Sequence, residues 1–139
     1  MLVGWAAVTN SLAWEPWLLF LVIFLWTPPH FWALAIRHSD EYRAAGVPML
    51  PVVESEKKVA SAMTTYCAAT VVASLALIWV ADLGPVYAVT AAVLGALFLG
   101  GTIALGRSPS AAGSMRLFSF SITYLSVLFV ALTVDVLVR

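Results

Sequence analysis

Charged residues are scarce in this chain of 139 amino acids. They make up 10% of the sequence, whereas hydrophobic residues make up 63%. Soluble domains carry roughly 25% charged residues, so the composition excludes an ordinary water-soluble domain and favours a protein embedded in lipid. Seven basic and seven acidic residues cancel, which leaves no net positive field to attract a nucleic acid.

The sequence also lacks a pair of cysteines and a regular alternation of polar and apolar residues. Cys67 is the single cysteine, so a disulfide cannot form within the chain. No segment of about ten residues alternates between polar and apolar side chains, which is the pattern of a transmembrane β-barrel. The missing alternation leaves helices as the way in which this chain would cross a membrane.

Long uncharged runs are what the chain has in abundance. A helix needs about 20 apolar residues to cross the hydrocarbon core of a bilayer. Four segments reach that length, at residues 17–36, 59–81, 86–106 and 115–138, the last with Arg116 and Asp135 near its ends and an uncharged centre. We therefore predict an all-α bundle of four transmembrane spans that forms a single domain, with the lipid bilayer as its first partner.

Basic residues are unevenly distributed among the connections between these spans. The connection between the first two spans contains four of them: Arg37, Arg43, Lys57 and Lys58. Arg107 lies between the last two spans, and the remaining connection has none. The positive-inside rule then places loops 37–58 and 107–114 in the cytoplasm. Both termini would lie outside the cell (inner) membrane, which suggests that further chain precedes residue 1.

The third span contains a stripe of small residues. Ala92, Ala96, Gly100 and Ala104 follow one another at intervals of four. Such stripes allow helix backbones to approach closely in a membrane. We therefore predict that this stripe is a packing face.

The end of the first span contains the sequence Thr27-Pro28-Pro29-His30. Two prolines inside a span remove backbone donors and predict a kink that leaves carbonyl groups without partners. An ionisable residue within a membrane suggests a function. Two interpretations of His30 remain open here: it bonds to a freed carbonyl, or it faces a ligand.

The first polar loop predicts a short helix. Ser39 is a suitable N-cap, Asp40 and Glu41 suit a first turn, and Gly46 suits the end. Carboxylates beside guanidinium and ammonium groups are typical of a site for a magnesium-bound diphosphate. The alternative is a solvated loop whose charges pair with one another, and composition alone favours that alternative.

A longer motif favours the diphosphate site over the solvated loop. The runs Trp26–Arg37 and Asp40–Val53 closely resemble the protoheme IX farnesyltransferases of the UbiA prenyltransferase superfamily, and Gly4–Thr9 and Arg116–Phe118 are also similar. The resemblance implies a bundle of nine transmembrane helices with two acidic motifs on cytoplasmic loops. It also implies transfer of a farnesyl group from farnesyl diphosphate to a vinyl group of haem b, which gives haem O.

The resemblance assigns roles to the loop residues as well. It implies that Asp40 and Glu41 bind Mg²⁺ as part of the second acidic motif, although family members often have an aspartate where this chain has Glu41. Arg37, Arg43 and Lys58 are the implied contacts of the diphosphate.

Two other residues are implied to act in the same reaction. Tyr42 would orient a carboxylate or stabilise developing cationic charge through its aromatic face. His30 would face the porphyrin. No protein nucleophile is required, since the electron-rich vinyl group attacks the farnesyl carbon itself.

The first acidic motif of the family, an Asn-Asp-x-x-Asp run, is absent from the sequence. Glu15, Asp82 and Asp135 are isolated and lie on the predicted outer side. The resemblance therefore implies that the chain corresponds to about the C-terminal half of such an enzyme, that an N-terminal half is a missing partner, and that the chain is inactive alone. The alternative is a non-catalytic membrane subunit or a haem-binding helical module that uses His30.

Overall fold

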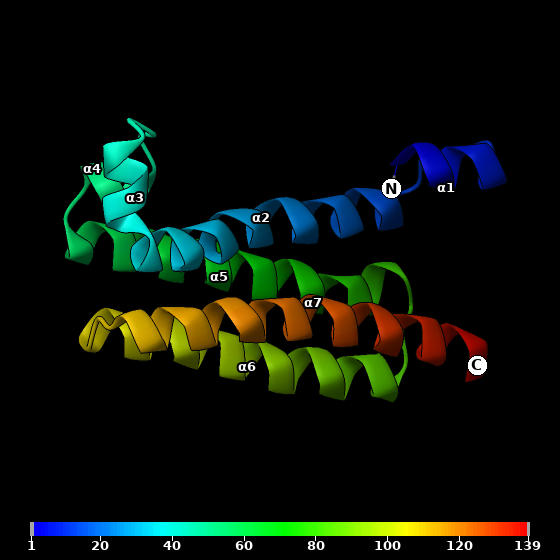
Figure 1. Cartoon of the computed structure of the whole chain (residues 1–139). Coiled ribbons are helices and arrows are strands. Elements are labelled where there is room, and N and C mark those ends of the chain that lie inside the picture. The colour runs from blue at the N-terminus through cyan, green and yellow to red at the C-terminus, as the bar shows by residue number, and fades with distance from the viewer. Residues whose placement is uncertain (1, 139) are drawn as a thin grey trace.

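The computed structural model describes residues 2–138 and is entirely helical over that range (Figure 1). Its elements, in chain order, are α1 (Leu2–Thr9), α2 (Trp14–Arg37), α3 (Ser39–Ala44), α4 (Leu50–Val53), α5 (Glu56–Val80), α6 (Pro85–Arg107) and α7 (Ala111–Val138). Four of these helices, α2, α5, α6 and α7, are long and apolar enough to cross a membrane. The predicted fold class of four transmembrane helices is confirmed.

Three of the four long helices start several residues before the apolar segments identified in the sequence. Helix α2 includes Glu15, α5 begins with Glu56-Lys57-Lys58, and α7 begins at Ala111 and includes Ser114. Hydropathy marks only the part of a helix that matches the hydrocarbon core. Backbone hydrogen bonding continues past it into the interfacial zone, where polar side chains are tolerated.

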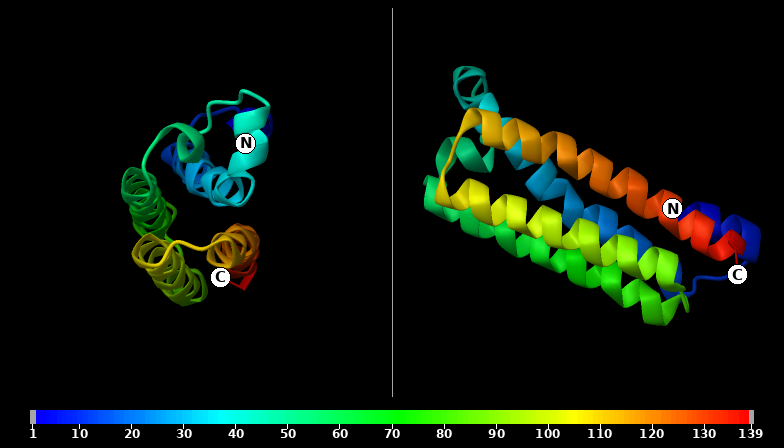
Figure 2. Two further views of the ribbon diagram at one scale, coloured as in Figure 1. Left: turned by 60° about the vertical axis from the view of Figure 1, so that its left-hand side comes forward. Right: turned by 90° about the horizontal axis from the view of Figure 1, so that it is seen from below.

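The four long helices form a ring in which each packs against two neighbours. Contacts join α2 to α5, α5 to α6, α6 to α7, and α7 back to α2. Figure 2 shows this arrangement nearly end-on. The interior is filled by side chains from all four helices, among them Val22, Met63, Leu77, Phe98 and Tyr124. Close van der Waals packing of this kind holds helices together where lipid gives no hydrophobic drive.

Hydrogen bonds between helices add to this packing. The hydroxyl groups of Ser74 and Tyr124 lie 2.8 Å apart and connect α5 to α7. The Tyr87 hydroxyl donates to the Ser74 carbonyl over 3.0 Å and connects α6 to α5. Since these groups have no water to bond to in the interior, each bond satisfies polar atoms that would otherwise be costly to bury.

Asp135 connects the end of α7 to the beginning of α6. It is only 2% exposed, and its carboxylate accepts hydrogen bonds from the backbone N–H groups of Gly84 and Tyr87. Gly84 is the N-cap residue of α6. Asp135 therefore supplies the side-chain acceptor that the start of this helix lacks in its own sequence.

The small-residue stripe of α6 does not face the other helices of the described residues, so its role as a packing face stays a prediction. Ala92, Ala96, Gly100 and Ala104 are all exposed. The buried face of α6 consists instead of Tyr87, Ala91, Gly95, Phe98, Thr102 and Leu105. Gly95 lets α6 approach α5 closely, because a Cβ atom there would lie 2.8 Å from Cγ1 of Val71 on α5.

Helix α2 remains a single helix from Trp14 to Arg37 although it contains Pro28 and Pro29. The loop that follows also differs in detail from our prediction. Ser39 is the first residue of α3 and not its N-cap, a position that His38 occupies without a capping side-chain bond. Helix α4 was not predicted, because its Leu-Pro-Val-Val sequence is apolar and too short to give a periodic signal.

Candidate functional site

The polar residues of interest gather at one end of the bundle. Helices α3 and α4 lie at the end where α6 turns into α7, while both termini lie at the opposite end (Figure 1). The two loops that carry basic residues therefore share one end, as the positive-inside rule requires of loops on the same side of a membrane.

Helix α3 positions the acidic motif. It is one and a half turns long, as expected for a short loop helix, and Gly46 follows it with φ of +67°. That left-handed conformation is easy for glycine and ends the helix. The N–H of Val47 donates to the carbonyl of Tyr42 over 2.9 Å, so the chain turns back directly after the motif. Tyr42 itself is half-buried.

The charges of α3 are paired locally. The Arg43 guanidinium donates to Oδ1 of Asp40 over 2.8 Å, and Nδ1 of His38 lies 3.0 Å from Oε2 of Glu41. The Asp40 side chain is nonetheless 95% exposed and that of Glu41 is 78% exposed. Ion pairs that are this exposed are weak, so the carboxylate oxygens remain accessible to a stronger ligand.

Lys58 also has an acidic partner, which the sequence analysis missed. Its ammonium group lies 2.6 Å from Oε1 of Glu54. The spacing of four residues was a usable signal, because side chains four apart meet on a helix, but Glu54 precedes the first residue of α5. Arg37, at the end of α2, is exposed and makes no ion pair within residues 2–138.

The donor set of α3 suits Mg²⁺ more than a metal that needs several protein ligands. Within the described residues, no group of three or more His, Cys, Asp or Glu side chains could hold a metal ion. Mg²⁺ usually binds one or two carboxylates and completes its octahedron with water and phosphate oxygens. The exposed carboxylates of Asp40 and Glu41 meet that requirement, with Arg43 beside them for a phosphate.

His30 lies away from α3, inside the ring. Its Nδ1 is 2.7 Å from the hydroxyl of Ser121 on α7. The imidazole is stacked between Trp26 and Phe118, with ring centroids 4.3 and 4.5 Å away. The Trp26 indole N–H donates to the Ser121 carbonyl over 2.9 Å. These four side chains join α2 to α7, and the hydrogen-bond partner of His30 is a hydroxyl and not a carbonyl freed by the prolines.

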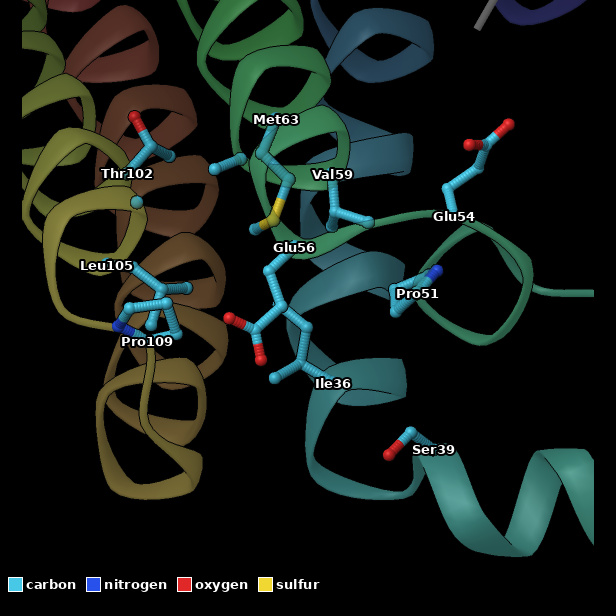
Figure 3. Close-up of a pocket in the computed structure, with 12 residues that line it drawn as sticks. Ile36, Ser39, Pro51, Glu54, Glu56, Val59, Met63, Thr102, Leu105 and Pro109 are labelled. Carbon is cyan, nitrogen blue, oxygen red and sulfur yellow. The ribbon is translucent and has the colours of Figure 1, made fainter.

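A cavity of about 130 Å³ lies beneath the loop helices, between α2, α5 and α6 (Figure 3). Its walls include Ile36, Val59 and Met63. The Glu56 carboxylate points into the cavity, whereas that of Glu54, at its edge, points away (Figure 3). None of the residues implied to bind Mg²⁺ or diphosphate lines it. The Glu56 carboxylate disfavours an anion by charge repulsion, so this cavity does not suit a diphosphate.

Comparison with known proteins identifies the family of this chain. The sequence model of the UbiA prenyltransferase family matches residues 1–132, and the chain belongs to that family. No solved structure matches the chain significantly. The four candidate membrane spans are consistent with a multi-pass membrane protein of this family.

The curated relatives are more specific. The chain is 50% identical to a protoheme IX farnesyltransferase of Frankia alni, over 99% of this chain and 49% of that protein. A protein of the same name from Rhodococcus jostii is 51% identical over 97% of this chain and 45% of its own length. One from Synechocystis is 47% identical over 96% and 43%. The chain thus spans about half the length of the curated relatives it matches.

Proposed function

We propose that this chain is part of a membrane prenyltransferase that transfers a farnesyl group from farnesyl diphosphate to a vinyl group of haem b. The observation that carries the proposal is the identity of about half of all residues, along nearly the whole chain, to proteins named protoheme IX farnesyltransferase. The loop helix α3 supports it, because its exposed carboxylates and Arg43 are suitable groups for a magnesium-bound diphosphate.

In this proposal Asp40 binds Mg²⁺, with Glu41 as a second ligand. Both would exchange their present partners, Arg43 and His38, for the metal. Arg43 is then free for a diphosphate oxygen, which it can bind in bidentate fashion. Arg37 and Lys58 supply further positive charge, and Lys58 would leave Glu54 to do so.

The reaction needs charge stabilisation more than proton transfer. Breaking the allylic C–O bond leaves its electron pair on the diphosphate and a positive charge on the farnesyl carbon. When bound, Mg²⁺ neutralises charge on the leaving group, and Arg37, Arg43 and Lys58 stabilise the remainder by electrostatic attraction. The vinyl group of haem b then forms the new C–C bond, which leaves a cation on the haem side chain. Water adds to that cation and releases a proton to the solvent, which leaves a hydroxyl group.

Two residues have secondary roles in the proposal. Tyr42, half-buried beside the acidic motif, orients a carboxylate or faces the developing cation. For His30 to face the porphyrin, its stack between Trp26 and Phe118 would have to open. We place the loops 37–58 and 107–114 on the cytoplasmic side of the cell inner membrane, where both substrates would be bound.

The binding step can be tested without turnover. We expect the chain in detergent to bind farnesyl diphosphate only when Mg²⁺ is present, as measured by isothermal titration calorimetry. Asp40→Asn should weaken this binding by about 10–100-fold, the loss that follows removal of groups supporting a metal site. Glu15→Gln, a matched loss of one acidic charge on α2 at the opposite end of the bundle, should leave it unchanged.

Two results would contradict the assignment: binding that does not depend on Mg²⁺, or equal affinities for the Asp40→Asn variant and the unaltered chain. The 139 residues by themselves supply one acidic motif, so we also propose that they do not form haem O from farnesyl diphosphate and haem b. Formation of haem O by the purified chain would refute that part and leave the binding result to be judged separately.

A further inference from the structure

A groove of about 320 Å³ runs between α6 and α7 on the outside of the ring. It lies at the same end of the bundle as the acidic loop but on different helices, since α3 and α4 connect α2 to α5. Leu97, Ala104 and Arg116 are exposed along it, so the groove opens toward the surroundings of the bundle and not into the interior.

The groove is polar at one end and apolar along the rest. Ser108 and Arg116 line it where α6 turns into α7, and Leu97, Ala104 and Phe120 line the part further from that turn. Leu97 precedes Ser108 by eleven residues, so the groove extends about 16 Å along the helix at 1.5 Å per residue. A molecule that fits would have a polar head at the loop and a hydrocarbon tail directed toward the bilayer centre.

The polar end favours an anionic head. Arg116 makes no ion pair within residues 2–138, and no acidic residue lines the groove. Arg116 lies in the second turn of α7. Arg107 ends α6 at the same turn. The acidic cavity between α2, α5 and α6 has the opposite character.

We propose that this groove binds an anionic phospholipid. The phosphate contacts Arg116 and the Ser108 hydroxyl, and one acyl chain lies along Ala104 and Phe120. Gly101 lines the groove as well, and the lack of a side chain there lets Leu117 of α7 pack against α6 as its floor. Basic pockets between transmembrane helices recognise anionic headgroups in this way.

Farnesyl diphosphate also has an anionic head and an apolar tail. The position of the groove favours the phospholipid, because it faces outward on α6 and α7. The acidic motif that would bind the diphosphate through Mg²⁺ lies on α3. The test therefore includes farnesyl diphosphate as a competitor.

Native mass spectrometry of the full chain, released from mixed micelles, measures lipid retention directly. With equal amounts of phosphatidylglycerol and phosphatidylcholine of the same acyl chains, we expect about five-fold preferential retention of phosphatidylglycerol, the contribution of about one basic side chain. Arg116→Gln should abolish the preference. Lys57→Gln removes a charge at the same end of the bundle, outside the groove, and should keep it.

A second variant tests the apolar part of the groove. Ala104→Trp fills it from an exposed position, and we expect it to reduce retention of both lipids at least several-fold while the helical content measured by circular dichroism is unchanged. Equal retention of the two lipids by the unaltered chain would overturn the proposal. So would an Arg116→Gln variant that keeps the preference, or displacement of the phospholipid by stoichiometric farnesyl diphosphate.

Discussion

At the scale of single residues, Asp135 connects two helices through its side chain. It is a buried carboxylate near the end of α7, and it accepts hydrogen bonds from Gly84 and Tyr87 at the start of α6. Asp135→Ala leaves the buried N–H of Tyr87 and the partly buried N–H of Gly84 without this acceptor. We expect the free energy of unfolding to fall by about 1–3 kcal/mol, the cost of unsatisfied buried donors, as measured by unfolding in sodium dodecyl sulfate.

The matched control for this substitution lies on the same helix. The Thr133 side chain is exposed, and its hydroxyl bonds back to the Phe129 carbonyl of its own helix. Thr133→Ala should change the free energy of unfolding by less than about 0.5 kcal/mol. Equal effects of the two substitutions would mean that the bond between α7 and α6 contributes nothing of its own.

Sequence reasoning predicted some residue contacts and missed others for a clear reason. Arg43 lies three residues after Asp40, so a helix brings the two side chains together, and their ion pair agrees with the alternative in which the loop charges pair with one another. His30 and Ser121 are 91 positions apart. No local pattern connects them, because their contact depends on how α2 and α7 are rotated in the ring. The roles of Asp40, Glu41 and His30 toward ligands stay predictions.

At the scale of the helix, α6 offers two glycines with opposite environments. A Cβ atom at Gly95 would lie 2.8 Å from Val71, whereas nothing lies within 4 Å of one at Gly100. Gly95→Leu should therefore force α6 away from α5 and lower the free energy of unfolding by about 1–3 kcal/mol or more, as overpacking does. Unfolding in sodium dodecyl sulfate again provides the measurement.

Gly100→Leu is the control at the other face of the same helix. We expect it to leave the unfolding transition nearly unchanged, because leucine is favourable against lipid. A loss of stability from Gly100→Leu that matches the loss from Gly95→Leu would show that the exposed face of α6 is packed against something in the solubilised protein.

The same helix shows why spans were easier to predict than their buried faces. In water, the buried face of a helix is apolar and the other face is polar, so periodicity identifies it. In lipid both faces are apolar, and that contrast disappears. Residue size alone indicated the stripe from Ala92 to Ala104, while the face of α6 that is buried against the other helices of this chain contains Tyr87, Gly95 and Phe98.

At the scale of the whole molecule, orientation is the property that the sequence predicts most directly. The two basic loops lie at one end of the bundle and the termini at the other (Figure 1). Cys67 is fully buried, so cysteines introduced elsewhere would be the reactive ones. We expect Ser11→Cys to react with a membrane-impermeant maleimide on intact cells, and Ser55→Cys and Ala112→Cys to react only after lysis.

Gel shift of the labelled chain is the measurement, and the unaltered chain, with its buried Cys67, is the control for background. Labelling of Ser55→Cys on intact cells, with Ser11→Cys protected, would reverse the proposed orientation. It would also place the acidic motif of α3 on the side of the membrane opposite to the one proposed.

The closure of the ring between α2 and α7 has a consequence for the order of assembly. The aromatic and hydroxyl environment of His30 comes from α7, whose Ser121 follows it by 91 residues. At a synthesis rate of about 5–20 residues per second, α2 waits on the order of 5 to 18 seconds for this partner. During that time an imidazole within a membrane span lacks its native hydrogen bond, so α2 cannot reach its final environment until α7 is made.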